Sequence, residues 1–208
     1  MNNPICFCYH PTKIVFIDDD ENCVNEITEA LEKNISFEIF TDPLKALDFF
    51  SKNYHPNTFI QSCYKESDDD HSPDQLDFKL DMRLLHLNEL TNNDRFNEIA
   101  VVVVDYAMPK LNGIELSRQL KVINPLLKII LLTGEADEHL AIQAFNEGVI
   151  DQYIQKPLES NQRLLTPILQ LQNSYFYDLT QTLVNKMDKT SKKELQWLQD
   201  SAVIQLFN

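Results

Sequence analysis

An alternation of short apolar runs with helical repeats is the feature of this sequence that most restricts its fold. Five short runs are predicted as strands, of which the first and the third are rich in β-branched residues, and residues at helical spacing follow each run. A strand–helix–strand unit returns the chain parallel to its start, so the pattern predicts an α/β fold, a doubly wound five-stranded parallel sheet with helices on both faces. The predicted strands are residues 13–18, 37–40, 99–104, 128–132 and 152–154.

The apolar residues between these strands predict the helices. The first helix covers residues 21–33, and the second starts at Pro43, a residue that suits a first helical turn. A third helix ends before Asn124-Pro125, and a fourth ends at Gly148. Each interval leaves room for one helical crossover between neighbouring parallel strands.

The interval 51–98 interrupts this alternation. Every second residue from 76 to 84 is apolar and the residues between are charged, which is the period of a half-exposed strand. With residues 58–65 as its partner and 67–73 as the turn, the interval predicts an inserted β-hairpin. The aspartates at 68–70 lack the glycine and the glutamate of a calcium loop, so a solvated hairpin tip is favoured over a calcium site.

Charge and glycine content argue against several classes of function. The net charge is −14, which speaks against nucleic acid and anionic membranes as direct partners. The three glycines cannot form the usual glycine-rich nucleotide loops. The longest apolar run, residues 99–104, is too short to span a membrane, and the start of the chain lacks the basic and apolar regions of a secretory signal.

The four cysteines follow neither the spacing of a disulfide scaffold nor that of a zinc site. Cys6, Cys8 and His10 could supply three metal ligands, but reduced thiols in a short extended segment are favoured. Together with the missing signal and membrane span, this pattern predicts a soluble protein of a reducing cytoplasm.

Polar residues follow four of the predicted strands, at the edge of the sheet where parallel strands end. Asp18 ends the first strand and Asp19 follows it, and Asp105 follows the third strand. Thr133 follows the fourth strand, and Lys156 follows the fifth. Neighbouring carboxylates repel unless a cation neutralises them, and oxygen ligands suit Mg²⁺. Lysine and threonine can bind phosphoryl oxygens, and a carboxylate can attack phosphorus, so this edge is a candidate site of phosphoryl chemistry.

Four segments of the sequence resemble the receiver domain of the response regulators of bacterial two-component systems. They are FIDDDE at residues 16–21, VVVVDYAMPKLNGIEL at 101–116, ILLTGEA at 130–136 and DQYIQKP at 151–157. The resemblance covers residues 13–158 apart from the inserted hairpin at 54–98. It implies a flavodoxin-like sheet with the strand order 2-1-3-4-5.

The resemblance also implies the chemistry of the site. Asp105 would accept a phosphoryl group from the phosphohistidine of a sensor histidine kinase or phosphotransfer protein. Asp18, Asp19 and Asp105 would hold Mg²⁺, with the backbone carbonyl of Ala107 as a further ligand. Such a protein is a phosphoprotein of a phosphorelay, limited to its own phosphotransfer and dephosphorylation, and is not an enzyme that acts on other substrates.

Three further residues take roles from the same resemblance. Thr133 and Lys156 would bind oxygens of the acyl phosphate. Tyr153 stands at the position of the family's aromatic switch, which turns inward as Thr133 moves. The Lys156–Pro157 peptide bond would be cis.

Two other functions stay open on the sequence alone. A degenerate receiver could act as a docking scaffold that needs no phosphorylation, although the acids, Thr133 and Lys156 argue against it. A Mg²⁺-dependent phosphohydrolase could use an aspartyl phosphate, but that class of enzyme has a second acid two residues after its nucleophile. This chain has Ala107 there.

Residues 159–208 predict a helical extension without net charge. Its first helix starts at Pro167 with Thr166 as N-cap, or earlier with a bend at the proline, and a second helix covers roughly residues 191–206. A homodimer through these helices or through the hairpin fits this pattern, and packing of the helices on the chain's own core fits it equally well. The chain ends without a clear stop signal, which leaves open a longer protein with an output domain.

Overall fold

The computed structural model describes residues 6, 8–30, 35–52, 54, 63–66, 78–134, 137–158 and 162–187. The chain packs as two compact units. One unit holds residues 11–56 and 96–175, and the other holds residues 1–10, 57–95 and 176–208. The division of the chain into a receiver and a helical extension stays a prediction.

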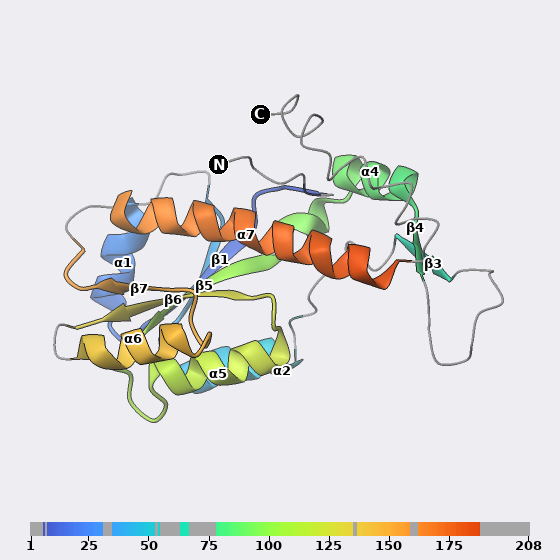
Figure 1. Cartoon of the computed structure of the whole chain (residues 1–208). Helices are drawn as coiled ribbons and strands as arrows, with labels where there is room; N and C mark the ends of the chain where they lie inside the picture. Colours follow the sequence, from blue (N-terminus) through green and yellow to red (C-terminus); the bar gives the residue numbers. More distant parts are fainter. Residues whose placement is uncertain are drawn as a thin grey trace. The chain divides into compact units, whose positions relative to one another are not determined.

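The first unit is built on a five-stranded parallel sheet, as the sequence predicts. Its strand order is β2-β1-β5-β6-β7, and every neighbouring pair is parallel (Figure 1). Compared with the sequence prediction, the first strand ends one residue earlier, and the last three strands end one residue later. The strands are β1 (Lys13–Ile17), β2 (Phe37–Phe40), β5 (Ile99–Asp105), β6 (Lys128–Thr133) and β7 (Gln152–Gln155).

Helices cover both faces of this sheet. Helices α2, α5 and α6 lie on one face, and α1 and the first part of α7 lie on the other (Figure 1). The predicted end of the first helix, at residues 31–33, falls outside the described residues. Gly148 ends the turn after α6 with a φ of +71°, a conformation that suits glycine. The helices are α1 (Glu21–Ala30), α2 (Pro43–Lys52), α5 (Gly113–Ile123), α6 (Glu138–Asn146) and α7 (Gln162–Lys186).

Strand β5 is the centre of the hydrophobic core. All seven of its residues are buried, because both faces of this central strand are covered. Each fully buried aliphatic side chain contributes about 1.5–3 kcal/mol of transfer free energy, so this run holds the sheet unit together. The core cluster that joins the sheet to α2, α5 and α6 includes Val15, Ile17, Ala46, Phe50, Val102, Val104, Leu116, Leu120, Leu131, Ala141 and Ala144.

Helix α7 starts earlier than one of the two sequence interpretations places it. The helix begins at Gln162, so Thr166 is not its N-cap, and Pro167 lies inside the helix. Proline removes one backbone hydrogen bond there, but Leu164 and Ile168 are buried and keep this part of the helix packed. The predicted second helix at 191–206 lies outside the described residues. Among the described helices, none has the length and apolarity needed to cross a membrane.

An inserted hairpin is present in the second unit, with three described residues in each strand, and residues 58–62 of the predicted partner strand lie outside the described residues. Strands β3 (Tyr64–Glu66) and β4 (Phe78–Leu80) pair antiparallel. The prediction that the strand continues to residue 84 is wrong, because α4 (Met82–Thr91) follows β4 directly. Asp81 caps this helix by accepting hydrogen bonds from the backbone N–H groups of Arg83 and Leu84, and this cap ends the strand.

Two features complete the insert. A 3₁₀ helix, η1 (Asn93–Asn97), follows α4 and leads the chain back towards β5. The predicted turn at 67–73 lies outside the described residues. Within the second unit, Asn88 on α4 donates a hydrogen bond to Cys63 Sγ at 3.2 Å, and the backbone N–H of Tyr9 donates to Glu89 at 3.3 Å.

A buried polar network in the first unit connects the two residues between which the insert lies. The Tyr54 hydroxyl lies 3.1 Å from Glu98 Oε1 and 2.9 Å from the carbonyl oxygen of Ile99. The Tyr175 hydroxyl of α7 donates to the same Glu98 oxygen at 2.5 Å. Asn124 donates to the Tyr54 hydroxyl at 3.2 Å. The network therefore joins Tyr54 and Glu98, at the two ends of the insert, to Tyr175 of α7.

Candidate functional site

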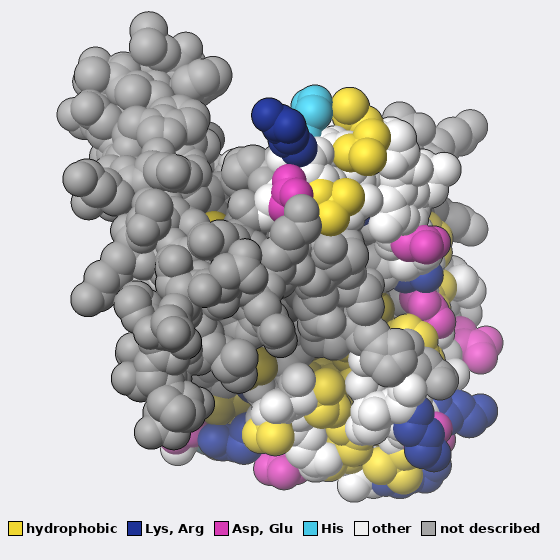
Figure 2. All heavy atoms as spheres, turned by 90° about the vertical axis from the view of Figure 1, so that its right-hand side faces the viewer, with side chains coloured by type: hydrophobic (Ala, Val, Ile, Leu, Met, Phe, Trp, Pro, Cys, Tyr) yellow, Lys and Arg dark blue, Asp and Glu magenta, His cyan; other side chains and the backbone are white. Residues whose placement is uncertain are grey.

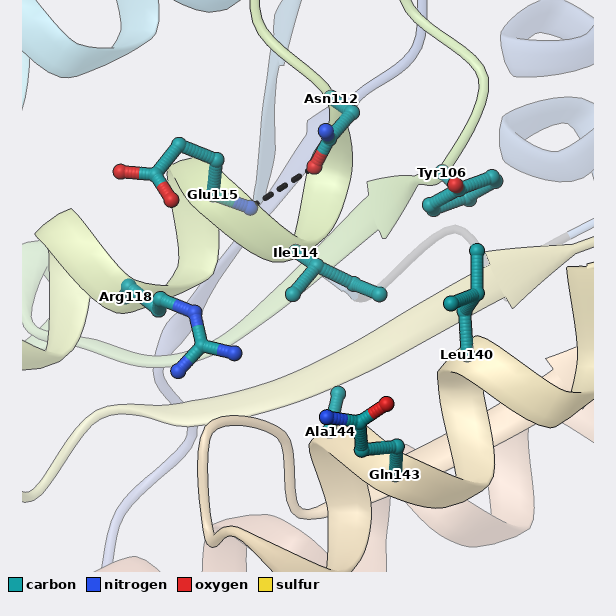
Figure 3. A pocket seen from close by; sticks show the side chains of 8 residues that line it. All are labelled: Tyr106, Asn112, Ile114, Glu115, Arg118, Leu140, Gln143 and Ala144. Carbon is teal, nitrogen blue, oxygen red and sulfur yellow. Dashed lines mark hydrogen bonds between the residues drawn. The ribbon is translucent and has the colours of Figure 1, made fainter.

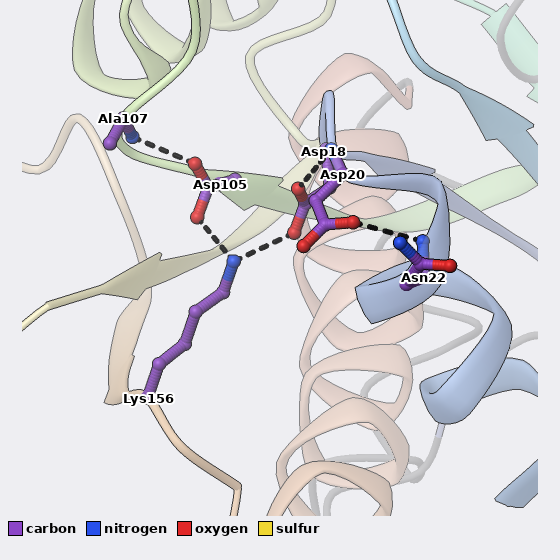
Figure 4. A network of polar contacts seen from close by, with 6 residues as sticks. All are labelled: Asp18, Asp20, Asn22, Asp105, Ala107 and Lys156. Atoms are coloured by element: carbon purple, nitrogen blue, oxygen red, sulfur yellow. Dashed lines mark hydrogen bonds and ion pairs between the residues drawn. The ribbon is translucent and has the colours of Figure 1, made fainter.

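The candidate site lies where β1, β5 and β7 end. Asp18 follows β1, Asp105 is the last residue of β5, and Lys156 follows β7. Lys156 Nζ lies 2.7 Å from Asp18 Oδ2 and 2.6 Å from Asp105 Oδ1, so one ammonium bridges two carboxylates (Figure 4). Asp18 and Asp105 are buried, and charge-assisted hydrogen bonds of this kind are strong there.

Backbone N–H groups hold the remaining oxygens of the two carboxylates. The N–H of Asp20 donates to Asp18 Oδ1 at 3.0 Å, and the N–H of Ala107 donates to Asp105 Oδ2 at 2.8 Å (Figure 4). Asp20 in turn accepts a hydrogen bond from the backbone N–H of Asn22 at 3.0 Å and thereby caps α1. The turns after β1 and β5 therefore fix the direction of both site carboxylates.

Burial and charge set the protonation of the two central groups. Burial, together with the charge of Asp18, raises the pKa of Asp105 above its ordinary value, although Lys156 and the Ala107 N–H act against the rise. For Lys156, burial alone would lower the pKa, but hydrogen bonds and charges from Asp105 and Asp18 outweigh it and raise the pKa. Lys156 is therefore a cation at neutral pH and neutralises part of the acidic cluster.

Three carboxylates at this edge fit a hard divalent cation. Asp18, Asp19 and Asp105 each place one oxygen within 4.8 Å of the others. Asp19 is exposed, so the cluster opens to solvent on its side. Carboxylate oxygens are the donors that Mg²⁺ prefers, and the donor set of this cluster suits that ion. The Ala107 contact in this structure is its N–H on Asp105, and its carbonyl as a ligand stays a prediction.

Thr133 and Tyr153 lie on neighbouring strands. Thr133 ends β6 and is buried, and its hydroxyl donates to the carbonyl oxygen of Gly134 at 3.2 Å. Its carbonyl oxygen accepts from the backbone N–H of Lys156 at 2.8 Å, which ties the two strand ends together. Tyr153 is half-buried against the core, and the Lys156–Pro157 bond is cis as predicted. The phosphoryl-binding and switching roles stay predictions.

Gly113 shapes the wall of the site behind Asp105. Its N–H donates to the Tyr106 carbonyl at 3.0 Å. A Cβ added at Gly113 would collide with the carbonyl oxygen of Asp105 and lie 2.9 Å from Leu131 Cδ1. The start of α5 approaches the end of β5 so closely that only glycine fits.

Sequence reasoning missed two neighbours of the site. Lys110 Nζ lies 2.9 Å from Asp42 Oδ2, and Lys110 has a φ of +71°, unusual for a residue with a side chain. This ion pair joins the loops after β5 and β2. Cys23 on α1 is the other neighbour. Burial, and then the charge of Asp18, raises the pKa of its thiol to about 11, so Cys23 is a neutral thiol at neutral pH. The Lys110–Asp42 pair joins distant segments, and the contact of Cys23 with Asp18 depends on how α1 packs against the end of β1, so no local sequence pattern predicts either contact.

A separate pocket lies between α5 and α6 (Figure 3). Its volume is about 260 Å³. Ile114, Leu140 and Ala144 supply apolar surface, and Tyr106 connects the pocket to the loop directly after Asp105. Arg118, on its lining, pairs with Glu147 at 2.7 Å. The carboxylates of the candidate site do not line this pocket.

Comparisons with known proteins agree with this geometry. The family model of the response regulator receiver domain matches residues 84–168. The C4-dicarboxylate transport transcriptional regulatory protein DctD of Pseudomonas aeruginosa is 44% identical over 61 residues, which are 29% of this chain and 13% of DctD. The transcriptional regulatory protein FixJ of Bradyrhizobium diazoefficiens is 38% identical over 60 residues, 29% of each protein.

Solved structures extend the likeness to the rest of the chain. The Legionella pneumophila response regulator LqsR superposes with a TM-score of 0.72 at 31% identity, covering 98% of this chain and 56% of that one. A response regulator receiver domain protein of Clostridium thermocellum superposes with a TM-score of 0.53 at 26% identity, covering 78% and 94%. This chain thus spans little more than half of LqsR, and its matches cover less than a third of DctD and FixJ. Residues 84–168 thus match the receiver domain of response regulators, and the sheet order and the acid–lysine cluster of this chain agree with that match.

Proposed function

We propose that this receiver is a phosphoacceptor, in which Asp105 takes a phosphoryl group from the phosphohistidine of a sensor histidine kinase or phosphotransfer protein. The observation that carries the proposal is the position of Lys156 Nζ, 2.6 Å from Asp105 and 2.7 Å from Asp18. A fixed ammonium beside a buried carboxylate supplies positive charge where phosphoryl oxygens would lie. The signal then passes on through protein contacts.

The transfer balances without any further reactant. An oxygen of the Asp105 carboxylate forms a bond to phosphorus while the phosphorus–nitrogen bond of the donor breaks. The electron pair stays on the imidazole, which then takes up a proton. Asp18 and Asp19, with Asp105, are the residues that would hold Mg²⁺. When bound, this ion supplies charge neutralisation between the acids and the phosphoryl oxygens.

Lys156, Thr133 and Tyr153 would respond to the new group. Lys156 keeps its bond to Asp18 and turns its charge to the phosphoryl oxygens. The Thr133 hydroxyl exchanges its bond to Gly134 for a phosphoryl oxygen, and Tyr153, half-buried on the next strand, fills the space that Thr133 leaves. A phosphoryl group adds about −1.5 to −2 charges, so the change is large enough to select between two packings of the β6–β7 face.

The wider organisation is part of the same proposal. A receiver over residues 13–158, with the insert at 54–98, carries a helical extension at 159–208 in a cytoplasmic signalling protein. The sheet unit extends past residue 158 to Tyr175 of α7, and the other unit groups residues 57–95 with residues 176–208.

Beryllofluoride, a mimic of the phosphoryl group, tests the proposal. We expect wild-type protein to bind it only with Mg²⁺, as followed by ¹⁹F NMR, and Asp105→Asn to bind none. The Asp94→Asn variant serves as the matched control, because Asp94 is exposed and lies outside the site. Absence of binding by the wild type would favour the docking scaffold, and multiple-turnover hydrolysis of small phosphoesters would favour the phosphohydrolase.

A further inference from the structure

The loop between β5 and α5, residues 106–112, contains a strained residue. Lys110 has a φ of +71°, and among the residues that the structure describes it is the one other than glycine with a positive φ. A side chain makes this conformation unfavourable, whereas glycine adopts it freely. Strain of this kind persists where the surroundings or a function require it, so the lysine at this position needs an explanation.

The ion pair of Lys110 with Asp42 does not explain the strain through stability alone. The Lys110 side chain is 60% exposed, and exposed ion pairs add little to stability. Another exposed pair joins Lys52 and Asp48, and Figure 2 shows basic and acidic side chains close together on one face of the molecule. For stability alone, glycine would serve at position 110 as well as lysine does.

The pair joins the loop beside Asp105 to the start of α2. Asp42 caps that helix, because its Oδ1 accepts a hydrogen bond from the backbone N–H of Leu44 at 2.9 Å. Its Oδ2 lies 2.9 Å from Lys110 Nζ, so a carboxylate that the helix fixes also fixes the lysine. Strand β1 lies between β2 and β5 in the sheet. The pair therefore connects the loops on either side of the strand end from which Asp18 leaves.

The same loop places a backbone group in the candidate site. The N–H of Ala107 donates to Asp105 Oδ2 at 2.8 Å and thereby orients the carboxylate. Met108 is buried in the core cluster and fixes the inner side of the loop. On the exposed side, Lys110 ties the loop to the Asp42 carboxylate. A loop held on one side only can tilt, so the second contact restricts the direction of the Ala107 N–H.

We propose that Lys110 is a positioning residue, whose ion pair with Asp42 holds the loop so that the Ala107 N–H stays on Asp105. Lys110 acts through this loop and not by touching the phosphoryl group. Its effect on a phosphoryl group rests on the proposed phosphoacceptor function, whereas its effect on the loop does not. A carboxylate oriented in advance binds more tightly, so loss of the pair should weaken binding without lowering the stability of the fold.

Amide hydrogen exchange of the full chain without Mg²⁺, followed by NMR, tests the effect on the loop. Lys110→Asn removes the charge and tolerates the left-handed conformation, and Asp42→Asn keeps an acceptor for the cap of α2. We expect the Ala107 amide to exchange about 2-fold to 5-fold faster in both variants. Lys52→Asn is the matched control, because it breaks the exposed pair with Asp48. It should leave the exchange of Ala107 unchanged.

Beryllofluoride binding in the presence of Mg²⁺ separates positioning from a simple effect of charge. Both partners of a positioning pair matter alike, so Lys110→Asn and Asp42→Asn should each weaken binding about 2-fold to 5-fold. The double variant should bind no more weakly than the single variants. As mere charges, Lys110 would favour the anionic mimic and Asp42 would disfavour it, so opposite shifts would overturn the positioning role. Lys110→Gly should weaken binding while its melting temperature stays at or above that of the wild type.

The positioning role and the phosphoacceptor function can fail independently. Unchanged exchange of the Ala107 amide in both variants overturns the positioning role, whether or not beryllofluoride binds. A loss of binding that Lys52→Asn reproduces assigns the effect to net charge and also overturns it. A wild type that binds no beryllofluoride contradicts the phosphoacceptor function, and the exchange rates then still decide whether Lys110 positions the loop.

Discussion

Single residues at the end of β5 decide whether the candidate site can form. Gly113 is the sharpest case, since a Cβ there would meet the carbonyl oxygen of Asp105. Gly113→Ala should destabilise the protein by about 2–4 kcal/mol, because β5 and α5 would have to move apart. Gly134→Ala is the control, because the nearest atom to its added Cβ is Asp137 Oδ2 at 4.0 Å. Urea denaturation of both variants measures the difference, and equal losses would contradict this explanation.

Asp105 itself lowers the stability of the unphosphorylated protein. Burial and the neighbouring Asp18 raise its pKa, so the folded state resists ionisation of this carboxyl more than the unfolded state does. Stability is therefore lost as the pH rises from the ordinary carboxyl pKa through the raised one. Asp105→Asn, measured without Mg²⁺, should raise the melting temperature by about 2 °C at neutral pH.

The pH dependence separates this explanation from a general effect of the substitution. Below the ordinary carboxyl pKa, Asp105 is protonated in both states, and the difference between wild type and Asp105→Asn should vanish. Lys156 keeps its contact with Asp18 in the variant, so its charge stays paired. Thermal denaturation across the acidic range provides the measurement. A variant less stable than the wild type at neutral pH would show that the Lys156–Asp105 bond outweighs the cost of burial.

Some residues of the site could be predicted from the sequence, and others could not. Parallel strands end at one edge of the sheet, so the positions after the predicted strands sufficed to place Asp18, Asp105 and Lys156 near one another. The Lys110–Asp42 pair and the contact of Cys23 with the acids depend on how loops and α1 fold over that edge. No periodicity or spacing within one segment carries that information.

Among the elements, the start of β5 and helix α7 are joined through the buried carboxylate of Glu98. Tyr175→Phe removes the hydroxyl that donates to Glu98 at 2.5 Å and should destabilise the protein by about 1.5–3 kcal/mol. Tyr177→Phe is a matched control on the same helix, because Tyr177 is exposed. Chemical denaturation compares the two variants. Similar stability of both would mean that Glu98 gains little from Tyr175.

The strands of the sheet were predictable because continuous β-branched runs leave few alternatives. The insert was harder, since residues 76–84 alternate like a strand while their second half belongs to α4. The cap at Asp81 decides that conflict in favour of the helix, and a short alternating pattern cannot outweigh a satisfied helix start. The start of α7 was ambiguous for a related reason, because Pro167 fits a first turn yet is tolerated inside a packed helix.

For the molecule as a whole, the acidic character has at least two components with different consequences. Part of the −14 charge belongs to the carboxylates at the end of the sheet, where a cation and Lys156 can balance it. The rest is spread over the surface and limits which partners approach.

Chemical trapping of the phosphorylated residue tests phosphoryl transfer to this receiver most directly. The full chain is incubated with a small-molecule phosphodonor and Mg²⁺ and then reduced with borohydride, which converts an aspartyl phosphate to homoserine. Peptide mass mapping should find homoserine at position 105, and Asp105→Asn should give none. Homoserine at another aspartate, or its absence from position 105 in wild-type protein that binds beryllofluoride, would contradict Asp105 as the phosphoacceptor.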